Sequence, residues 1–367
     1  MFQVCELKVR KCGSSRVLPC YDVEVHTKGI LRVSGRRWVD LLVRVELEQE
    51  GEVDREINIY RTVVEDMKKY FSEKYMNRSK FLPIPRYVEV TGSNHSRSFF
   101  ILETMRHLGY KKDILKNPEG LNDEHSLLVV ANLAKFHAAS YCFRKEKKID
   151  FRDYSVLNHT LSVPIIRKET IQILERILKT FPASASQSHK NFLDQSKLEN
   201  LDKNLEYFGV LCHGHLCREN LLFRYKSNLE SHLCCTDVIL QDLSSSYYGS
   251  CVLDLLQFIF SSIDNTFRPR SVVKIMSSVY YDSFIKTVSS INSGIPVFSY
   301  NDFLKEIGNC IFYGFHFAVD IHTFLYKEAL DNYKDEGEIS EIKYVRQVEA
   351  LIRHIVQFRI EMEDNDF

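Results

Sequence analysis

The first fifty residues have a pattern of hydrophobic and polar side chains that favours β-strands. Residues 21–25 alternate regularly, and residues 38–45 are rich in apolar and β-branched side chains. Gly29 and Gly35 lie between these segments and act as turn signals. We therefore predict two strands, at 21–25 and 38–45, in an N-terminal region that is mostly β-structure.

A helical pattern follows, and then a return to short strands. Between 53 and 70 the apolar side chains recur at helical spacing on one face, namely Ile59, Tyr60, Val63, Val64 and Met67. Pro83 and Pro85 come after this segment and favour its termination. Residues 87–90 and 98–102 again have the composition of strands.

Helical periodicity dominates after Glu103. Asn122 or Asp123 can cap a helix that continues to Tyr141. Further helices are predicted at 165–180, 253–263, 272–288, 300–325 and 341–362, with a loop at 182–188 and short strands at 208–212, 221–225 and 238–240. This order predicts an α+β protein with two lobes, a β-rich lobe at residues 1–104 and a helical lobe at 105–367.

Composition and charge narrow the class of protein. The chain has 367 residues, 44% of them hydrophobic and 27% charged, with only 14 glycines and 8 prolines, so collagen-like and low-complexity classes are excluded. Lysine plus arginine and aspartate plus glutamate both total 49, giving a formal net charge of zero. A nucleic-acid-binding protein normally has a basic face, so we expect no nucleic-acid partner.

Cysteine usage and hydropathy indicate a reducing compartment. Ten cysteines without a C-x-x-C pair do not form a disulfide framework, so free thiols are expected. The N-terminal residues lack the apolar run of a signal peptide. The apolar stretch at 251–263 is short and contains Asp254, so we expect no membrane span and a cytoplasmic location.

The segment 211–225, LCHGHLCRENLLFRY, carries the clearest chemical signal. Polar residues lie between two apolar strands, and Asp242 follows about twenty residues later, with Asp254 beyond it. This order resembles the phosphotransferase catalytic loop H-G-D-x-x-x-x-N followed by a metal-binding aspartate. More closely, it resembles the ecdysteroid-kinase-like (CHK kinase-like) family, whose relatives are the choline and aminoglycoside kinases.

Other segments match the same family in order and spacing. They are a helix motif at 56–60, a hinge at 101–103, the helix LAKFHAA at 133–139, and late helical signatures at 280–283 and 312–315. The resemblance thus spans roughly residues 35–325 and implies a two-lobed, protein-kinase-like fold. The implied reaction is transfer of the γ-phosphate of ATP to a hydroxyl of a small, steroid-like molecule.

The resemblance also implies roles for individual residues. Asn220 and Asp242 match the two Mg²⁺ ligands, and their oxygen atoms suit a hard cation. Glu103 matches the hinge that contacts ATP, and Glu56 matches the helix partner of a strand cation. That cation is Arg44 here, and the position of the catalytic aspartate is His215.

Several positions depart from the family pattern. His215 offers an imidazole in place of a constant negative charge, and Arg44 lacks the compact ammonium of lysine. The phosphate-covering loop should lie within 10–24, yet Gly13 is its single glycine, and no G-x-G occurs in the chain. Leu243 and Ser244 replace the phenylalanine and glutamine of the family's D-F-Q. We therefore predict a kinase-like protein whose catalysis is impaired, a pseudokinase.

Two other functions remain open: an active small-molecule kinase that uses His215, and a non-catalytic protein that binds a nucleotide or an apolar ligand.

Several single residues also have alternative structural roles. Asp254 either braces the catalytic loop or caps the following helix, and Glu56 is alternatively a solvated helix residue. His137 is expected to be a hydrogen-bonded core histidine, and His213 to support the catalytic loop. A zinc site is not expected at Cys212, His213, His215 and Cys217, because adjacent strand positions point to opposite sides. The sequence does not define the oligomeric state.

Overall fold

The computed structural model groups the chain into two compact units. It describes residues 3–11, 20–28, 38–46, 52–74, 81–88, 99–103, 108–112, 120–158, 171–172, 175, 201–227, 233–264, 272–332, 346 and 348–355. Unit 1 comprises residues 1–116, 147–158 and 219–246, and unit 2 comprises residues 117–146, 159–218 and 247–367. The predicted lobe boundary between residues 104 and 105 stays a prediction.

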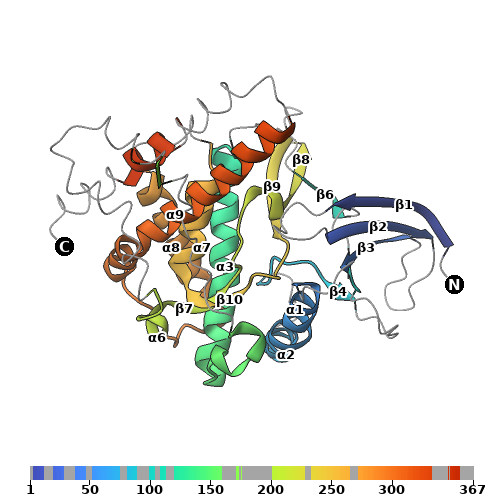
Figure 1. The fold of residues 1–367 in the computed structure, drawn as a ribbon. Helices are drawn as coiled ribbons and strands as arrows, with labels where there is room; N and C mark the ends of the chain where they lie inside the picture. The colour runs from blue at the N-terminus through green and yellow to red at the C-terminus, as the bar shows by residue number, and fades with distance from the viewer. Residues whose placement is uncertain are drawn as a thin grey trace. The chain divides into compact units, whose positions relative to one another are not determined.

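Unit 1 contains a five-stranded antiparallel sheet with the order β1-β2-β3-β5-β4 (Figure 1). Its strands are β1 (Gln3–Lys11), β2 (Cys20–Lys28), β3 (Trp38–Glu46), β4 (Tyr87–Val88) and β5 (Phe99–Glu103). Strands were predicted in four of these regions, one from alternation and three from their composition, and the structure confirms them. Arg44 on β3 pairs with Asp22 on one side and with Phe100 on the other, so it lies in the middle of the sheet.

The helical segment of unit 1 runs without interruption from residue 52 to residue 74. It consists of α1 (Glu52–Ile59), a π-helical turn (Tyr60–Val64) and α2 (Glu65–Lys74). The predicted apolar face is fully buried at Ile59, Tyr60, Val63, Val64 and Met67. The predicted helix is therefore confirmed, and it continues one turn past its expected end because Tyr70 and Phe71 also enter the core.

A second sheet in unit 1 is built around a β-hairpin. It has the order β6-β8-β9, where β6 is Tyr110–Lys111, β8 is Leu221–Ser227 and β9 is Leu233–Leu240. The antiparallel register pairs Leu221 with Leu240, the first residue of β8 with the last of β9. The residues just before β8 and just after β9 are therefore brought to the same end of the hairpin.

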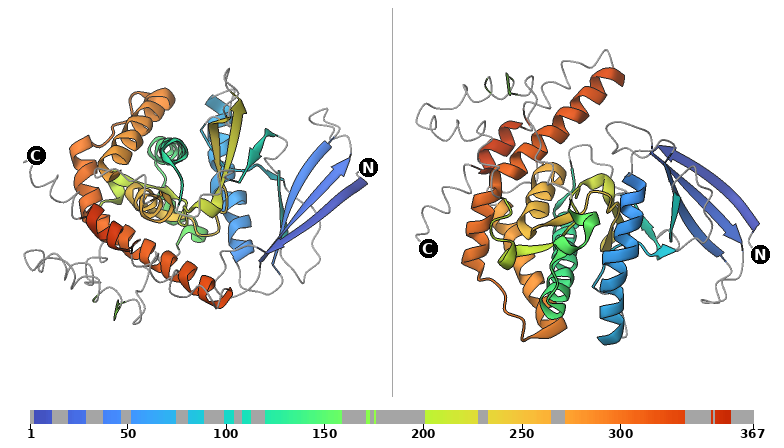
Figure 2. Two further views of the ribbon diagram at one scale, coloured as in Figure 1. Left: turned by 90° about the horizontal axis from the view of Figure 1, so that it is seen from above. Right: turned by 60° about the horizontal axis from the view of Figure 1, so that its bottom comes forward.

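Unit 2 is mainly helical, as predicted for the C-terminal part. Its long helices are α3 (Asp123–Lys147), α7 (Cys251–Ser262), α8 (Val272–Asn292) and α9 (Tyr300–Asn332). Helix α7 packs against α8 and α9 (Figure 2) and is buried at nearly every position. A short helix, α6 (Leu205–Phe208), leads into a two-stranded sheet of β7 (Gly209–Cys212) and β10 (Tyr247–Ser250).

Helix α3 is long and apolar enough to cross a membrane by length and composition. However, 78% of its apolar window is buried inside the structure, and buried core helices pass the same test. Its inward residues include Val130, Leu133 and His137, all fully buried. Within the described part of the chain we therefore assign α3 to the core of unit 2.

The described helices and strands confirm the predicted α+β fold class. Residues 348–355 are helical, which agrees with the helix predicted at 341–362. Most of the predicted helix at 165–180, the loop at 182–188 and the greater part of the predicted phosphate loop within 10–24 lie outside the described residues.

Candidate functional site

The β8–β9 hairpin brings the two predicted metal ligands together. Asn220 directly precedes β8, and Asp242 follows β9 by two residues. The backbone N–H of Gln241 donates to the carbonyl of Asn220 at 2.8 Å, which ties the two connections to each other. Asn220 and Asp242 are 8% and 7% exposed. Two mostly buried oxygen-bearing side chains therefore flank one end of the hairpin in unit 1.

The backbone of Asp242 adopts a left-handed conformation, with φ at +69°. Aspartate tolerates this region better than most residues because its short side chain can bond to the local backbone. Here Oδ1 accepts a hydrogen bond from the Ser244 hydroxyl at 2.6 Å and one from the Ser244 N–H at 3.3 Å. These bonds hold the carboxylate in one orientation.

Two neighbouring residues of α1 hold the loop that carries Asp242. The fully buried carboxylate of Glu56 accepts the backbone N–H of Leu243 at 3.1 Å, so Glu56 is not a solvated helix residue. The Arg55 guanidinium donates to the carbonyls of Ser244 at 2.5 Å and Ser246 at 2.6 Å, and to that of Val156 at 3.3 Å. The fork of the guanidinium thus clamps the turn after Asp242.

Sequence reasoning missed Arg55 and the role of Ser244. Arg55 looks like an ordinary helix charge, because its acceptors lie 101 to 191 residues away in the chain. Ser244 had a usable signal, since a serine two residues after an aspartate commonly bonds to that side chain.

Arg55→Met is expected to loosen the Asp242 loop. Three backbone carbonyls lose a charged donor, so we expect the free energy of unfolding to fall by about 2 kcal/mol. Urea denaturation would measure this loss. Arg61→Met is the matched control, because Arg61 is exposed and, among the described residues, donates a hydrogen bond to the Tyr87 hydroxyl at 2.9 Å. Equal stability of the two variants would contradict the clamp.

Arg44 and Glu103 lie on adjacent strands of the large sheet. Arg44 pairs with Phe100, and Glu103, the last residue of β5, pairs with Leu41. The side chains of Arg44 and Glu103 lie outside the described part of the structure, as does the segment 12–19. Their roles at a nucleotide therefore stay predictions.

In unit 2, two side chains of α7 hold the loop at residues 213–216. The Asp254 carboxylate accepts the N–H of His213 at 2.5 Å and that of Gly214 at 2.9 Å. One turn further on, Gln257 accepts the N–H of Leu216 at 3.3 Å and donates to the carbonyl of Gly214 at 3.2 Å. Asp254 therefore braces the loop, which decides between the two roles predicted for it.

His137 completes a buried network behind Asp254. Its Nε2 lies 3.0 Å from Asp254 Oδ2, and its Nδ1 lies 2.7 Å from the Tyr280 hydroxyl. All three side chains are fully buried. Burial by itself raises the pKa of Asp254, but the hydrogen bond and charge of His137, the charge of His213 and the Gly214 N–H hold that pKa below its usual value. The predicted core histidine is thus confirmed, with a specific partner.

The loop presents His215 at its outer part. The His215 N–H donates to Nδ1 of His213 at 3.4 Å, so His213 supports the loop as predicted. Gly214, at φ +83°, allows the chain to turn between them. The His215 ring lies edge-on to Phe317 at 6.1 Å and is partly exposed. An imidazole, not a carboxylate, therefore occupies this position of unit 2.

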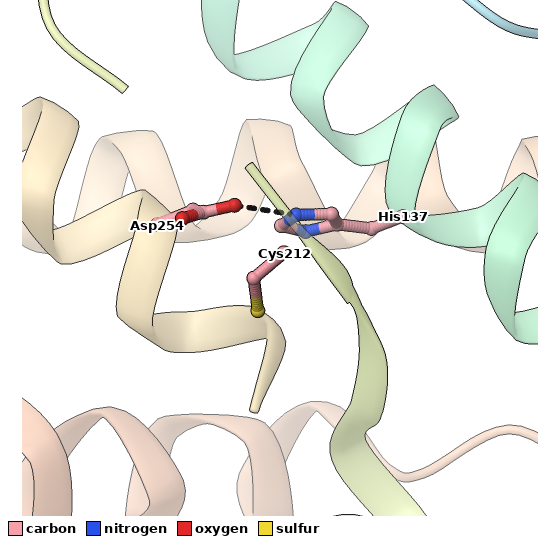
Figure 3. Close-up of side chains that lie close together, drawn as sticks. All are labelled: His137, Cys212 and Asp254. Atoms are coloured by element: carbon pink, nitrogen blue, oxygen red, sulfur yellow. Dashed lines mark hydrogen bonds and ion pairs between the residues drawn. The ribbon is translucent and has the colours of Figure 1, made fainter. Parts of the chain in front are cut away.

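His137, Cys212 and Asp254 also have the residue types of a metal site. Their candidate ligand atoms lie within 4.8 Å of one another (Figure 3). The chemistry does not fit, because Asp254 and His137 already bond to each other and Asp254 accepts two backbone N–H groups. Burial, reinforced by the charge of Asp254, raises the pKa of the Cys212 thiol and disfavours the thiolate that zinc requires.

The loop of unit 2 and the hairpin end of unit 1 carry the features of a kinase-like phosphotransferase. The model of the ecdysteroid kinase-like family matches residues 44–293, more than two thirds of the chain. The chain belongs to this family. The matched region contains Glu56, His215, Asn220 and Asp242.

Comparison with solved structures finds distant likenesses to kinases. An amicoumacin kinase, hAmiN, in complex with AMP-PNP, Ca²⁺ and Ami is 10% identical, with 93% of this chain and 87% of that chain covered and a TM-score of 0.42. A choline kinase from Cryptosporidium parvum Iowa II is 12% identical, with 98% and 90% covered and a TM-score of 0.40. A search of curated proteins found no match.

Proposed function

We propose that this protein binds Mg²⁺·ATP through the Asp242 loop and is an inefficient small-molecule kinase. The observation that carries the proposal is the clamped metal loop, in which Glu56, Arg55 and Ser244 hold the segment 242–246. Two neighbouring residues of α1, far from the loop in sequence, and one residue of the loop itself hold the segment that carries the Asp242 carboxylate. Such support is what a preorganised ligand needs.

The donor set fits magnesium. The side-chain oxygens of Asn220 and Asp242 are hard ligands, and Mg²⁺ in nucleotide enzymes is commonly bound by few protein ligands, with phosphate and water completing its shell. Once bound, the ion would neutralise negative charge on the phosphates during transfer. Asp242 would supply the anionic ligand, and Asn220 a neutral one.

His215 is the reason for proposing weak catalysis. A carboxylate at this position orients the acceptor hydroxyl and accepts its proton while offsetting nearby positive charge. Neutral imidazole can accept a proton but adds no negative charge. We propose a small-molecule hydroxyl as the acceptor, steroid-like as the family resemblance implies, and an active kinase that uses His215 as the alternative.

Thermal denaturation with ATP, with and without Mg²⁺, tests the proposal. We expect millimolar Mg²⁺·ATP to raise the melting temperature, because a ligand that binds the folded state stabilises it by mass action. Asp242→Asn should abolish the part of the shift that depends on Mg²⁺. The matched control is Asp237→Asn, on β9 of the same sheet, where the carboxylate bonds to Tyr110 and Arg224.

The control variant should lower the baseline melting temperature but keep the Mg²⁺-dependent shift. Two results would contradict the proposal. One is the absence of any shift by Mg²⁺·ATP at millimolar concentration, and the other is an unchanged shift in Asp242→Asn.

A further inference from the structure

Unit 2 contains a pocket of about 590 Å³ that the proposed function does not use. Its walls include the aromatic rings of Tyr141, Phe208 and Phe298, and Tyr207 of α6 lies at its edge. The first three are at most 8% exposed, whereas Tyr207 is 63% exposed. The volume lies within the range of pockets that hold drug-sized ligands, and an aromatic lining is typical of such sites.

The pocket is separate from the 213–216 loop, although both lie in unit 2. Phe208 precedes β7, whereas the loop follows the opposite end of that strand. A four-residue strand spans about 13 Å. A ligand seated beside Phe208 and Phe298 is therefore a strand's length away from His215.

Lys145 provides a cation beside the aromatic wall. Its ammonium donates to the carbonyl of Glu206 at 3.0 Å and lies 5.6 Å from the centre of the Tyr141 ring. No carboxylate among the described residues forms an ion pair with Lys145. Because an ammonium has three donors, Lys145 retains hydrogen-bonding capacity toward an incoming anion.

The surroundings of Lys145 also disfavour its unpaired charge. Burial and the neighbouring Arg144 lower the pKa of Lys145, and the charge of Glu206 offsets them only in part. An anion bound in the pocket would stabilise the charged form of Lys145, which burial and Arg144 destabilise. The electrostatics of Lys145 and the geometry of the pocket therefore both favour an anionic ligand.

Two acidic residues, Asp302 and Glu306, line the pocket, and both already accept hydrogen bonds from the protein. The Glu306 carboxylate accepts the Asn204 amide at 2.8 Å and the Ser250 hydroxyl at 3.0 Å, and the side chain is 3% exposed. Asp302 is exposed and accepts the Ser299 hydroxyl at 2.6 Å. Lys305 is exposed as well, so Lys145 is the partly buried cation of the lining and favours an anionic ligand.

We propose that this pocket binds a small organic anion with an apolar, ring-containing body and one carboxylate. The body packs against Phe208, Phe298 and Tyr207, and the carboxylate pairs with Lys145. The pairing is a charge-assisted hydrogen bond in a partly desolvated site, where such bonds are stronger than at an open surface. The site is independent of the proposed nucleotide site.

Titration calorimetry of the full chain with three probes of one ring system tests this site. The probes are naphthoate, naphthylmethanol and naphthylmethylammonium, which share their apolar body and differ in charge. We expect naphthoate to bind at least tenfold more tightly than the other two. Lys145→Met should weaken naphthoate binding by about tenfold to a hundredfold, the usual worth of a hydrogen bond to a charged group.

Lys305→Met is the matched control, because Lys305 also lines the pocket but is exposed and is expected to leave affinity within about twofold. Tyr207→Ser should weaken all three probes to a similar extent, since it removes apolar contact only. The proposal is overturned if naphthoate fails to bind at millimolar concentration, if Lys145→Met leaves its affinity unchanged, or if the ammonium probe binds most tightly, which would point to the carboxylates of Asp302 and Glu306 instead.

Discussion

Asp254→Asn is expected to lower the free energy of unfolding by roughly 3 kcal/mol, the largest stability loss of any change considered for this chain. The substitution keeps the shape of the side chain but removes its charge. An amide has one acceptor oxygen, while the carboxylate serves the N–H groups of His213 and Gly214 and also His137. At least one of these buried donors therefore loses its partner. Urea denaturation, followed by tryptophan fluorescence and circular dichroism, measures the loss.

The decrease in the free energy of unfolding at low pH provides a second test of the role of Asp254. Its pKa is held below the usual value in the folded protein, so its contribution is fully present above the unfolded pKa of about 3.9 and is lost as pH falls through the folded pKa. The natural protein should lose stability steeply below about pH 4, and Asp254→Asn should show a shallower decline. Asp282→Asn is the control, because Asp282 is exposed on α8. If both variants behave alike, the bracing role of Asp254 is refuted.

His215→Asp is expected to raise ATP turnover by about a hundredfold, the lower end of what a positioned general base contributes. The change restores an anionic acceptor on a loop that Asp254 and Gln257 already hold in place. Release of inorganic phosphate from ATP measures the gain without knowledge of the physiological acceptor. The same substitution combined with Arg44→Lys tests whether the strand cation limits the gain.

His215→Asn is the matched control for this gain of function. It replaces imidazole with a polar side chain of the same size as aspartate but without charge, so turnover should stay at the original level. Adding Asp242→Asn to His215→Asp should remove the gain, because the anionic metal ligand is lost. A folded His215→Asp variant with unchanged turnover would show that the mapping of the catalytic position is wrong.

The elements of regular structure were predictable because their signals are local. The apolar and β-branched composition at 38–45 and the helical face at 53–70 are such signals, and the structure has β3 and the helix from residue 52 to residue 74 at these places. Asn220 and Asp242 were predicted as a pair from the family resemblance, and the structure places both at one end of the β8–β9 hairpin. The ends of elements were less accurate, since tertiary contacts such as those of Phe71 extend a helix beyond its pattern.

The supporting contacts of the site could not be predicted in the same way. Arg55 bonds to carbonyls up to 191 residues away, and its own neighbourhood in the chain gives no hint of them. Glu56 was expected to act on a strand cation, and the structure adds a bond to the Leu243 N–H. The pocket beside Lys145 combines residues from three separate segments, and no periodic pattern links them.

The sequence by itself determined the α+β class, the order of the elements, the kinase-like family and the imidazole at position 215. These depend on residue types and spacing, which a linear chain displays directly. Only the tertiary structure decided that Asp254 braces the loop and that Arg55 clamps the turn after Asp242. Asp254 and its partner His137 are 117 residues apart, so their hydrogen bond exists only once packing has brought α3 and α7 together and excluded water between them.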